Sequence, residues 1–227
     1  MALRKVEILV SAKVVGKYEA RSYPEDSFTD QNWIELYEVP VYQLVVSGKD
    51  DDGADQKFEF QAPRFMPYYN DPKKPDTEYG ARGWLSAGLS SARTITVSTY
   101  LADYEIHNRH STFHGAIVMQ GAFYIHGGPE TLDDVGFGSA GCIEIIGNFN
   151  FFKLKIASLS GSSQYAAIKS SDTAGTKPTP QMVAKSDAAI KDLVSNRKLV
   201  IEMKQADAPD IKKKLTRKVK RKDLFGE

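Results

Sequence analysis

Segments with the residue pattern of β-strands fill most of the first two thirds of the chain, and they constrain its fold more than any other feature. Val6–Val15 is rich in β-branched residues, Glu35–Val46 is mostly apolar or aromatic, and Thr94–Tyr100 alternates between polar and apolar positions. Side chains of these types pack well on a pleated sheet. The same pattern predicts shorter strands at Phe58–Gln61, Ala116–Met119, Ala122–His126, Cys142–Ile146 and Lys198–Met203.

Two segments have the pattern of a helix. Phe149–Ser158 is expected to form a short helix, and Gln181–Ser195 carries apolar residues at the spacing of one helical face. Many strands with few helices favour a mainly β fold, which is a sandwich or a barrel with a few short helices.

The composition excludes several classes of protein. Hydrophobic residues make up 41 % of the 227 residues, which is enough for a core. Cys142 is the single cysteine, so an intrachain disulfide is impossible. No apolar run reaches the ~18 residues of a membrane-spanning helix, and we expect no membrane span. The formal net charge of +1 gives no reason to expect a nucleic-acid partner, and none is predicted.

The two ends of the chain differ in character. At the start, Glu7 and Lys13 interrupt the apolar stretch that a signal peptide would need. The last segment, 207–227, holds eight basic and four acidic residues, a net charge of +4. We expect a solvated, poorly ordered basic tail, and binding of an anionic polymer or a partner protein is the alternative.

One polar turn partly imitates a calcium loop. Asp50, Asp52, Gly53 and Glu59 fall at loop positions three, five, six and twelve, but Gly48 stands at position one where aspartate is usual. The flanking segments have the pattern of strands rather than helices, so a solvated hairpin turn is the preferred interpretation.

Three histidines, His107, His110 and His114, have spacings that would suit a helix. No carboxylate–histidine motif accompanies them, so we interpret them as surface or structural residues. No metal and no cofactor is predicted.

The stretch with the clearest chemistry runs from Tyr124 to Ile146. His126 ends a predicted strand, and Cys142 follows sixteen residues later, across a loop rich in glycine. A thiol becomes a nucleophile as the thiolate, and a nearby imidazole can take its proton and return it to a leaving amine. Gly141 allows tight backbone geometry before the cysteine, where N–H groups can form an oxyanion hole.

Alternation along the two strands adds two neighbours to this pair. Tyr124 falls on the same face as His126, and Glu144 falls on the same face as Cys142. A carboxylate so close to the sulfur should raise the pKa of the thiol.

The motif resembles that of a known family. His126-Gly127, followed by Ser139-Ala140-Gly141-Cys142-Ile143, resembles the signature of the L,D-transpeptidase (YkuD-type) catalytic domain. Two positions depart from that signature, because Ala140 stands where the family usually has histidine and Glu144 stands where arginine or asparagine is common. The variant found here is most similar to the L,D-transpeptidase-like toxins exported by type VI secretion systems.

The resemblance implies a role for each matched residue. Cys142 would be the nucleophile, and His126 would be the general base and acid. The carbonyl of Gly127 would orient the imidazole, and Ser139 would support the site by hydrogen bonding. The backbone N–H groups of Gly141 and Cys142 would form the oxyanion hole.

A second set of residues would bind the substrate, namely Tyr124, Gly128 and Glu144. The implied substrate is a peptidoglycan tetrapeptide stem, attacked at the carbonyl of the L-centre of diaminopimelate with loss of the terminal D-Ala. The thioester then passes to water, to a D-amino acid or to the amine of another stem. These outcomes are L,D-carboxypeptidase, exchange and L,D-transpeptidase activity.

The resemblance also implies an organisation and a setting. Residues 81–206 would be the catalytic domain, 1–80 a β-rich extension packed on it or part of it, and 207–227 the basic tail. The protein would be made in a bacterial cytoplasm without a Sec signal and exported as an antibacterial effector into a target cell's periplasm. An immunity protein and a secretion-system component would be its partners.

Two other interpretations stay open. Other cysteine hydrolases are one, although papain-like and NlpC/P60-type enzymes place cysteine before histidine, whereas His126 precedes Cys142 here. The other is a catalytically silent module on the same fold that binds cell wall or a secretion partner. Ala140 and Glu144 favour that interpretation.

Overall fold

The computed structural model describes residues 2–21, 33–68, 80–82, 89–105, 113–136, 141–165 and 177–225. The prediction of a mainly β fold with a few short helices is confirmed. The strands are β1 (Val6–Arg21), β2 (Trp33–Lys49), β3 (Asp55–Pro63), β4 (Met66–Tyr68), β5 (Gly80–Arg82), β6 (Arg93–Thr96), β7 (Tyr100–Glu105), β8 (His114–Gln120), β9 (Phe123–Gly127), β10 (Ile143–Ile145), β11 (Leu199–Met203) and β12 (Leu215–Lys220). The helices are α1 (Phe149–Leu159), α2 (Pro180–Ser195), α3 (Arg221–Phe225) and a 3-10 turn, η2 (Ile211–Lys214).

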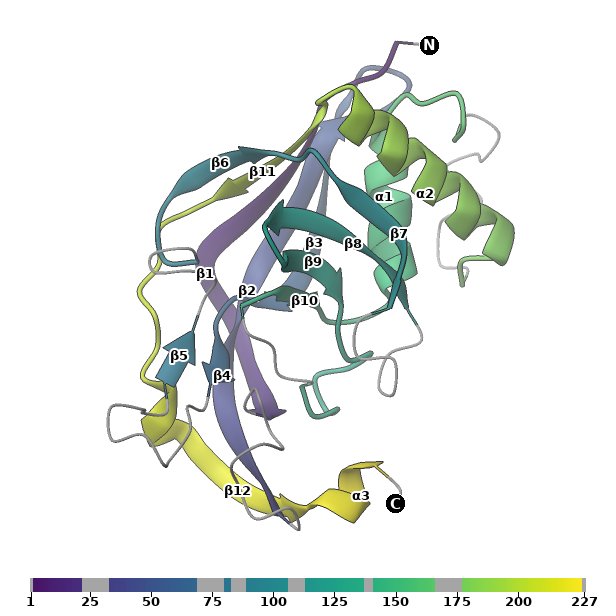
Figure 1. Cartoon of the computed structure of the whole chain (residues 1–227). Helices are drawn as coiled ribbons and strands as arrows, with labels where there is room; N and C mark the ends of the chain where they lie inside the picture. The colour runs from purple at the N-terminus through teal and green to yellow at the C-terminus, as the bar shows by residue number, and fades with distance from the viewer. Residues whose placement is uncertain are drawn as a thin grey trace.

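The larger sheet joins the two ends of the chain. Its order is β12-β2-β1-β11-β6, with β3 also paired to β2 (Figure 1). Strand β1 pairs in parallel with β11, so the N-terminal segment and residues 199–203 belong to one sheet. Its register against β2 shifts twice between Val10 and Gly16, and such bulges bend a long strand.

The smaller sheet has the order β10-β9-β8-β7. Strands β8 and β9 form the predicted hairpin, although β8 extends to Gln120 and the turn falls at Gly121 and Ala122. Gly121 has a φ of +55°, a conformation that glycine adopts without strain. Strand β10 pairs in parallel with β9, so the strand ending in His126 and the strand following Cys142 are direct neighbours.

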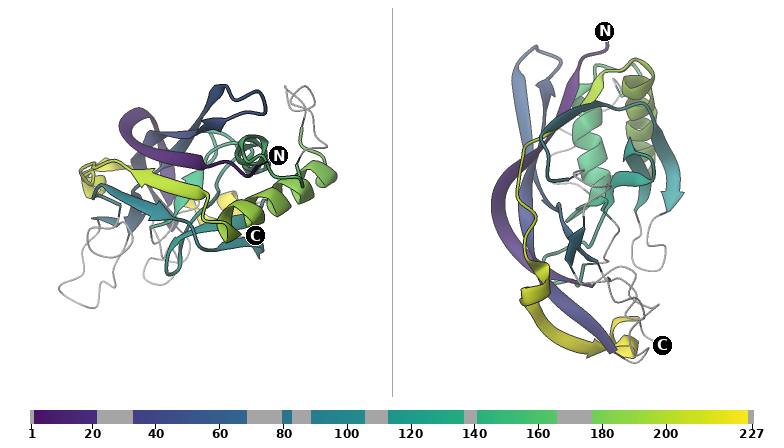
Figure 2. Two further views of the ribbon diagram at one scale, coloured as in Figure 1. Left: turned by 90° about the horizontal axis from the view of Figure 1, so that it is seen from above. Right: turned by 60° about the vertical axis from the view of Figure 1, so that its left-hand side comes forward.

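Helices α1 and α2 confirm the two predicted helical segments to within a residue or two at each end. The side chain of Asn148 caps α1 by accepting a hydrogen bond from the Phe151 N–H at 3.1 Å. Phe152 of α1 meets Phe60 of β3 edge to face, with ring centroids 5.0 Å apart. Figure 2 shows α1 and α2 on the same side of the larger sheet as the smaller sheet.

The C-terminal segment corrects one prediction. Residues 215–220 form β12 and pair with β2, so this part of the tail is not a poorly ordered terminus. Its basic residues lie against glutamates of β1 and β2, because Arg217 contacts Glu19 and Lys218 contacts Glu35, each at 2.8 Å. The sequence alone does not show that these glutamates face the tail.

The polar turn around Asp50 is a hairpin turn between two strands, which is the interpretation preferred over a calcium loop. Strands β2 and β3 flank it, and the Asp50 carboxylate accepts hydrogen bonds from the backbone N–H groups of Asp52 and Ala54. Of the three histidines, His107 and His110 lie outside the described residues. His114 is exposed, with its Nδ1 3.5 Å from a Glu105 oxygen. Within the described ranges, no helix has the length and apolar character needed to cross a membrane.

Candidate active site

Strands β9 and β10 place the predicted site residues on one face. The parallel register sets Glu144 beside His126, so Tyr124, His126, Cys142 and Glu144 share the same side of the two strands. Neighbouring strands lie ~4.8 Å apart and two residues span ~6.6 Å, so the Cα atoms of Cys142 and His126 lie ~8 Å apart on the diagonal. Ser139 lies outside the described residues.

The imidazole of His126 is held by the backbone. The ring is buried, and its Nδ1 lies 2.8 Å from the carbonyl oxygen of Gly127. A carbonyl only accepts hydrogen bonds, so Nδ1 carries the proton and the lone pair of the neutral ring is on Nε2. The contact expected between His126 and Gly127 is therefore present.

Close packing requires glycine at the two positions that follow His126. A Cβ on Gly127 would lie 2.9 Å from Cβ of Phe113 and 3.1 Å from Cβ of Phe149. A Cβ on Gly128 would lie 2.9 Å from Cβ of Glu144. These two positions let β9, β10 and α1 approach closely, so part of the motif serves the fold as well as the site.

The environment of Cys142 keeps its thiol protonated at neutral pH. The side chain is 9 % exposed, and its Sγ accepts a hydrogen bond from the Tyr124 N–H at 3.4 Å. Burial raises the pKa of the Cys142 thiol to about 12; the Tyr124 N–H acts in the opposite direction, and the charge of Glu144 raises it further. The direction expected for Glu144 is confirmed. Gly141, just before the thiol, has a φ of +127°, which side chains disfavour.

Two residues of β1, Tyr18 and Arg21, join the site and were missed by the sequence reasoning. Both are buried. Burial, followed by the charge of Glu144, raises the pKa of the Tyr18 hydroxyl well above its ordinary value, and Arg21 opposes that shift. Their effects on one hydroxyl place the Arg21 and Glu144 charges around it. More than a hundred residues separate β1 from Cys142, and no local pattern marks either side chain.

Strand β1 also fixes the loop that leads to Cys142. The carbonyl of Gly136 accepts hydrogen bonds from the Arg21 N–H at 3.1 Å and from its Nε at 3.4 Å, and the Gly136 N–H donates to Glu19 at 2.8 Å. A Cβ on Gly136 would collide with the Tyr18 ring. The loop between the histidine and the cysteine is therefore anchored at its middle by the first strand.

An aromatic pair lies beside the thiol. Tyr104 of β7, a third residue that the sequence reasoning missed, lies with its ring centroid 5.2 Å from that of Tyr124. Burial is the first cause that raises the pKa of Tyr124, and interaction with Tyr104 adds to it. The two half-exposed rings form an apolar wall with polar hydroxyl ends.

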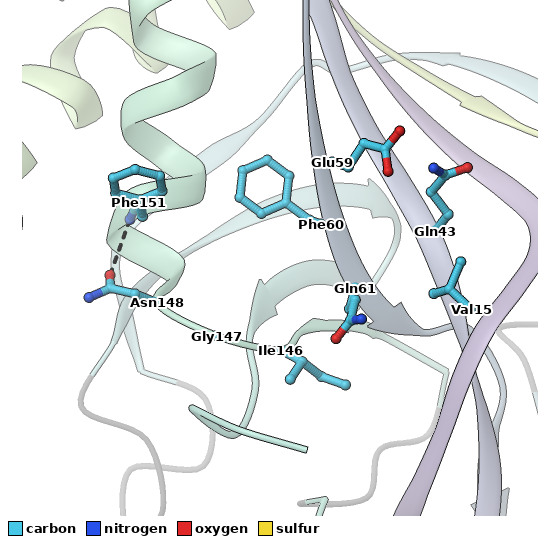
Figure 3. A pocket seen from close by; sticks show the side chains of 9 residues that line it. All are labelled: Val15, Gln43, Glu59, Phe60, Gln61, Ile146, Gly147, Asn148 and Phe151. Carbon is cyan, nitrogen blue, oxygen red and sulfur yellow. Dashed lines mark hydrogen bonds between the residues drawn. The ribbon is translucent and has the colours of Figure 1, made fainter. Parts of the chain in front are cut away.

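Two cavities of the described structure have linings that do not include Cys142. One of about 440 Å³ adjoins Ile146–Asn148, beyond the far end of β10 (Figure 3). Another of about 540 Å³ lies between Val14, Pro40 and Pro209.

Comparison with known proteins gives no match. No family model, no curated protein and no solved structure matches the chain. The chemistry of the site therefore has to be argued from its own residues.

Proposed function

We propose that the chain is a cysteine-dependent enzyme that acts on tetrapeptide stems of peptidoglycan as an L,D-carboxypeptidase or L,D-transpeptidase. The observation that carries the proposal is the His126 Nδ1 contact with the Gly127 carbonyl, on the strand that pairs in parallel with β10, which begins directly after Cys142. This contact leaves Nε2 as the basic nitrogen, on the face that also carries the thiol.

The reaction has two halves. The sulfur of Cys142 attacks the carbonyl of the L-centre of diaminopimelate while Nε2 of His126 takes the thiol proton. The N–H groups of Gly141 and Cys142 stabilise the oxyanion, and His126 returns the proton to the amine of the leaving D-Ala. Water, a D-amino acid or the amine of another stem then attacks the thioester, gives up a proton to His126 and restores the thiol.

Electrostatics supports proton transfer at the moment of attack. With a thiol pKa of about 12, little thiolate exists at neutral pH before substrate binds. His126 has to act as base during the attack itself rather than hold a preformed ion pair. The resting thiol is thereby protected from oxidation.

The biological setting is part of the same proposal. The residues Ile125-His126-Gly127-Gly128 and Ser139–Glu144 resemble those of type VI secretion effectors, which act in the periplasm of a target cell. An immunity protein that blocks Cys142 and a secretion-system component would then be the partners.

A catalytically silent binding module is the second candidate. The burial of Cys142 and the raised pKa of its thiol favour it, because a buried neutral thiol is usually inert. On this alternative the same face would bind a stem peptide without cleaving it.

The deciding experiment is mass spectrometry of a purified disaccharide-tetrapeptide after incubation with the protein, with Cys142→Ala in parallel. The enzyme proposal is supported if the substrate loses one D-Ala, or exchanges it for an added D-amino acid, with the wild-type protein but not with Cys142→Ala. Unchanged substrate, also with D-amino acids and a second stem present, refutes it in favour of the binding module.

A further inference from the structure

The cavity beyond β10 is lined by side chains with unused hydrogen-bonding groups. Gln43 of β2 and Gln61 of β3 are direct partners in the sheet register and both line the cavity (Figure 3). Among the described residues, neither side-chain amide makes a hydrogen bond within the protein. Asn148 uses its oxygen to cap α1, and its NH₂ group remains as a donor. The cavity therefore offers amide donors and acceptors to a ligand.

Apolar surface completes the lining. The rings of Phe60 and Phe151 lie on the α1 side of the cavity, whereas Val15 lies on the opposite side with β1 (Figure 3). Phe60 is held in place by Phe152, and Phe151 by the Lys155 ammonium 4.8 Å from its ring centroid. Each ring therefore has a packing partner outside the cavity.

Charge narrows the ligand class. Of the described side chains that line the cavity, only that of Glu59 is charged. No cationic side chain is among the described lining residues, which disfavours phosphate groups and nucleotides as ligands. A wholly apolar ligand would bury the Gln43 and Gln61 amides without partners, at a cost in free energy. A neutral ligand with hydroxyl and amide groups and an apolar ring face fits best, and an N-acetylated amino sugar has that chemistry.

The position of the cavity matches the proposed substrate. From Cys142 to Ile146 the chain passes through β10 and advances four residues, roughly 13 Å when extended. Three stem residues separate the attacked carbonyl from the sugar that carries the stem, and they span roughly 10 Å when extended. We propose that this cavity binds the N-acetylated sugar of the glycan strand while the stem peptide reaches Cys142. This inference rests on the proposed function.

A binding measurement tests the site independently of catalysis. The full chain is titrated with an N-acetylglucosamine tetramer and followed by calorimetry. Gln61→Glu keeps size and backbone but replaces the two amide donors by a carboxylate, and we expect it to weaken binding about fivefold or more. Phe151→Ala should weaken it similarly, and the exposed Gln205→Ala is the matched control. Absent binding at millimolar tetramer, or equal binding by both cavity variants, overturns the inference.

A turnover measurement separates this inference from the proposed function. Wild type should process the disaccharide-tetrapeptide with a higher kcat/KM than the free tetrapeptide, and Gln61→Glu should lose that advantage while processing the free peptide equally well. Equal kcat/KM for the two substrates in the wild type overturns the sugar site and leaves the enzyme proposal standing. Tetramer binding without any turnover refutes the enzyme and retains the sugar site.

Discussion

The described part of the chain holds two clusters of buried ionisable side chains, and they are built differently. In the first, the fully buried Lys153 ammonium donates to Asp187 at 2.9 Å and to the His114 carbonyl at 3.1 Å, and the Tyr100 hydroxyl also donates to Asp187. In the second, a thiol, an imidazole and a carboxylate share one face of β9 and β10.

The two clusters therefore have different roles: the Lys153 cluster stabilises the fold, whereas the Cys142 cluster serves the proposed chemistry. The Lys153 contacts tie α1 to α2 and β8, so their removal should affect the fold. His126 contacts the Gly127 carbonyl and Cys142 accepts from the Tyr124 N–H, and such contacts to backbone atoms orient the two side chains. Five predictions test this contrast, from the largest expected effect to the smallest.

Cys142→Ala should abolish D-Ala release, a loss of about 10⁴-fold or more, because no other nucleophile can form the acyl-enzyme. Stability should change little, since only one sulfur is removed. Release of D-Ala and the urea midpoint are measured on the same preparation. Activity that survives the substitution would remove Cys142 from the mechanism.

Lys153→Met should lower the free energy of unfolding by about 3 kcal/mol, because Asp187 and Tyr100 lose their buried cation. Activity per folded molecule should persist. Urea unfolding with D-Ala release measures both quantities. The double variant with Asp187→Leu should recover part of the stability. A loss of activity without a loss of stability would contradict the structural role.

Gly127→Ala places a Cβ against Phe113 and Phe149, next to His126 in the chain, and should affect both stability and activity. Overpacking of this kind costs about 2 kcal/mol. The shift of β9 should also reduce kcat. Gly53→Ala, where no atom lies within 4 Å, is the control for space, although its φ of +81° adds some strain. If stability and kcat are unchanged in Gly127→Ala, then β9 can move away from Phe113 and Phe149 without cost, which contradicts this prediction.

The Cys142 thiol should make the free energy of unfolding depend on pH above about pH 9. Its pKa rises from 9.0 to about 12 on folding, so above pH 9 the unfolded chain releases a proton that the folded chain retains. Stability therefore falls as pH rises, by about 1.4 kcal/mol at pH 10 relative to neutral pH. Urea unfolding of wild type minus Cys142→Ala isolates this contribution. A difference that stays constant between pH 7 and 10 would mean that the folded thiol has an ordinary pKa.

Glu144→Gln should increase the alkylation rate of Cys142 a few-fold at pH 8, since the charge that raises the thiol pKa is removed while the shape is kept. Iodoacetamide labelling under native conditions measures it. The exposed Glu130→Gln serves as control. A slower reaction would mean that Glu144 helps to deprotonate the thiol.

Local pattern predicted much of this structure. The β8–β9 hairpin, both longer helices and the two same-face pairs, Tyr124 with His126 and Cys142 with Glu144, follow from alternation and helical spacing, which depend on neighbouring residues. Only the parallel register of β9 and β10 brings the two pairs to one face. Strand β12 could not be predicted in this way, because its basic sequence becomes a strand only against Glu19 and Glu35.

Part of the candidate site could not be predicted from local sequence pattern either, because tertiary contacts form it. Tyr18 lies in an ordinary apolar strand, and only tertiary packing brings its hydroxyl beside Glu144. The cavity beyond β10 combines segments from β1, β2, β3 and α1, so no single stretch of sequence carries its signal.

The anchoring of Gly136 by β1 has a consequence for how the protein matures. The loop between His126 and Cys142 is divided at Gly136 into two shorter arcs, and shorter arcs lose less chain entropy on closing. That gain exists only after β1 has docked, and the end of β1 that holds Gly136 pairs with β2 through Glu19–Arg21. The final geometry of the nucleophile and its base therefore depends on the docking of β1 as well as on the motif itself.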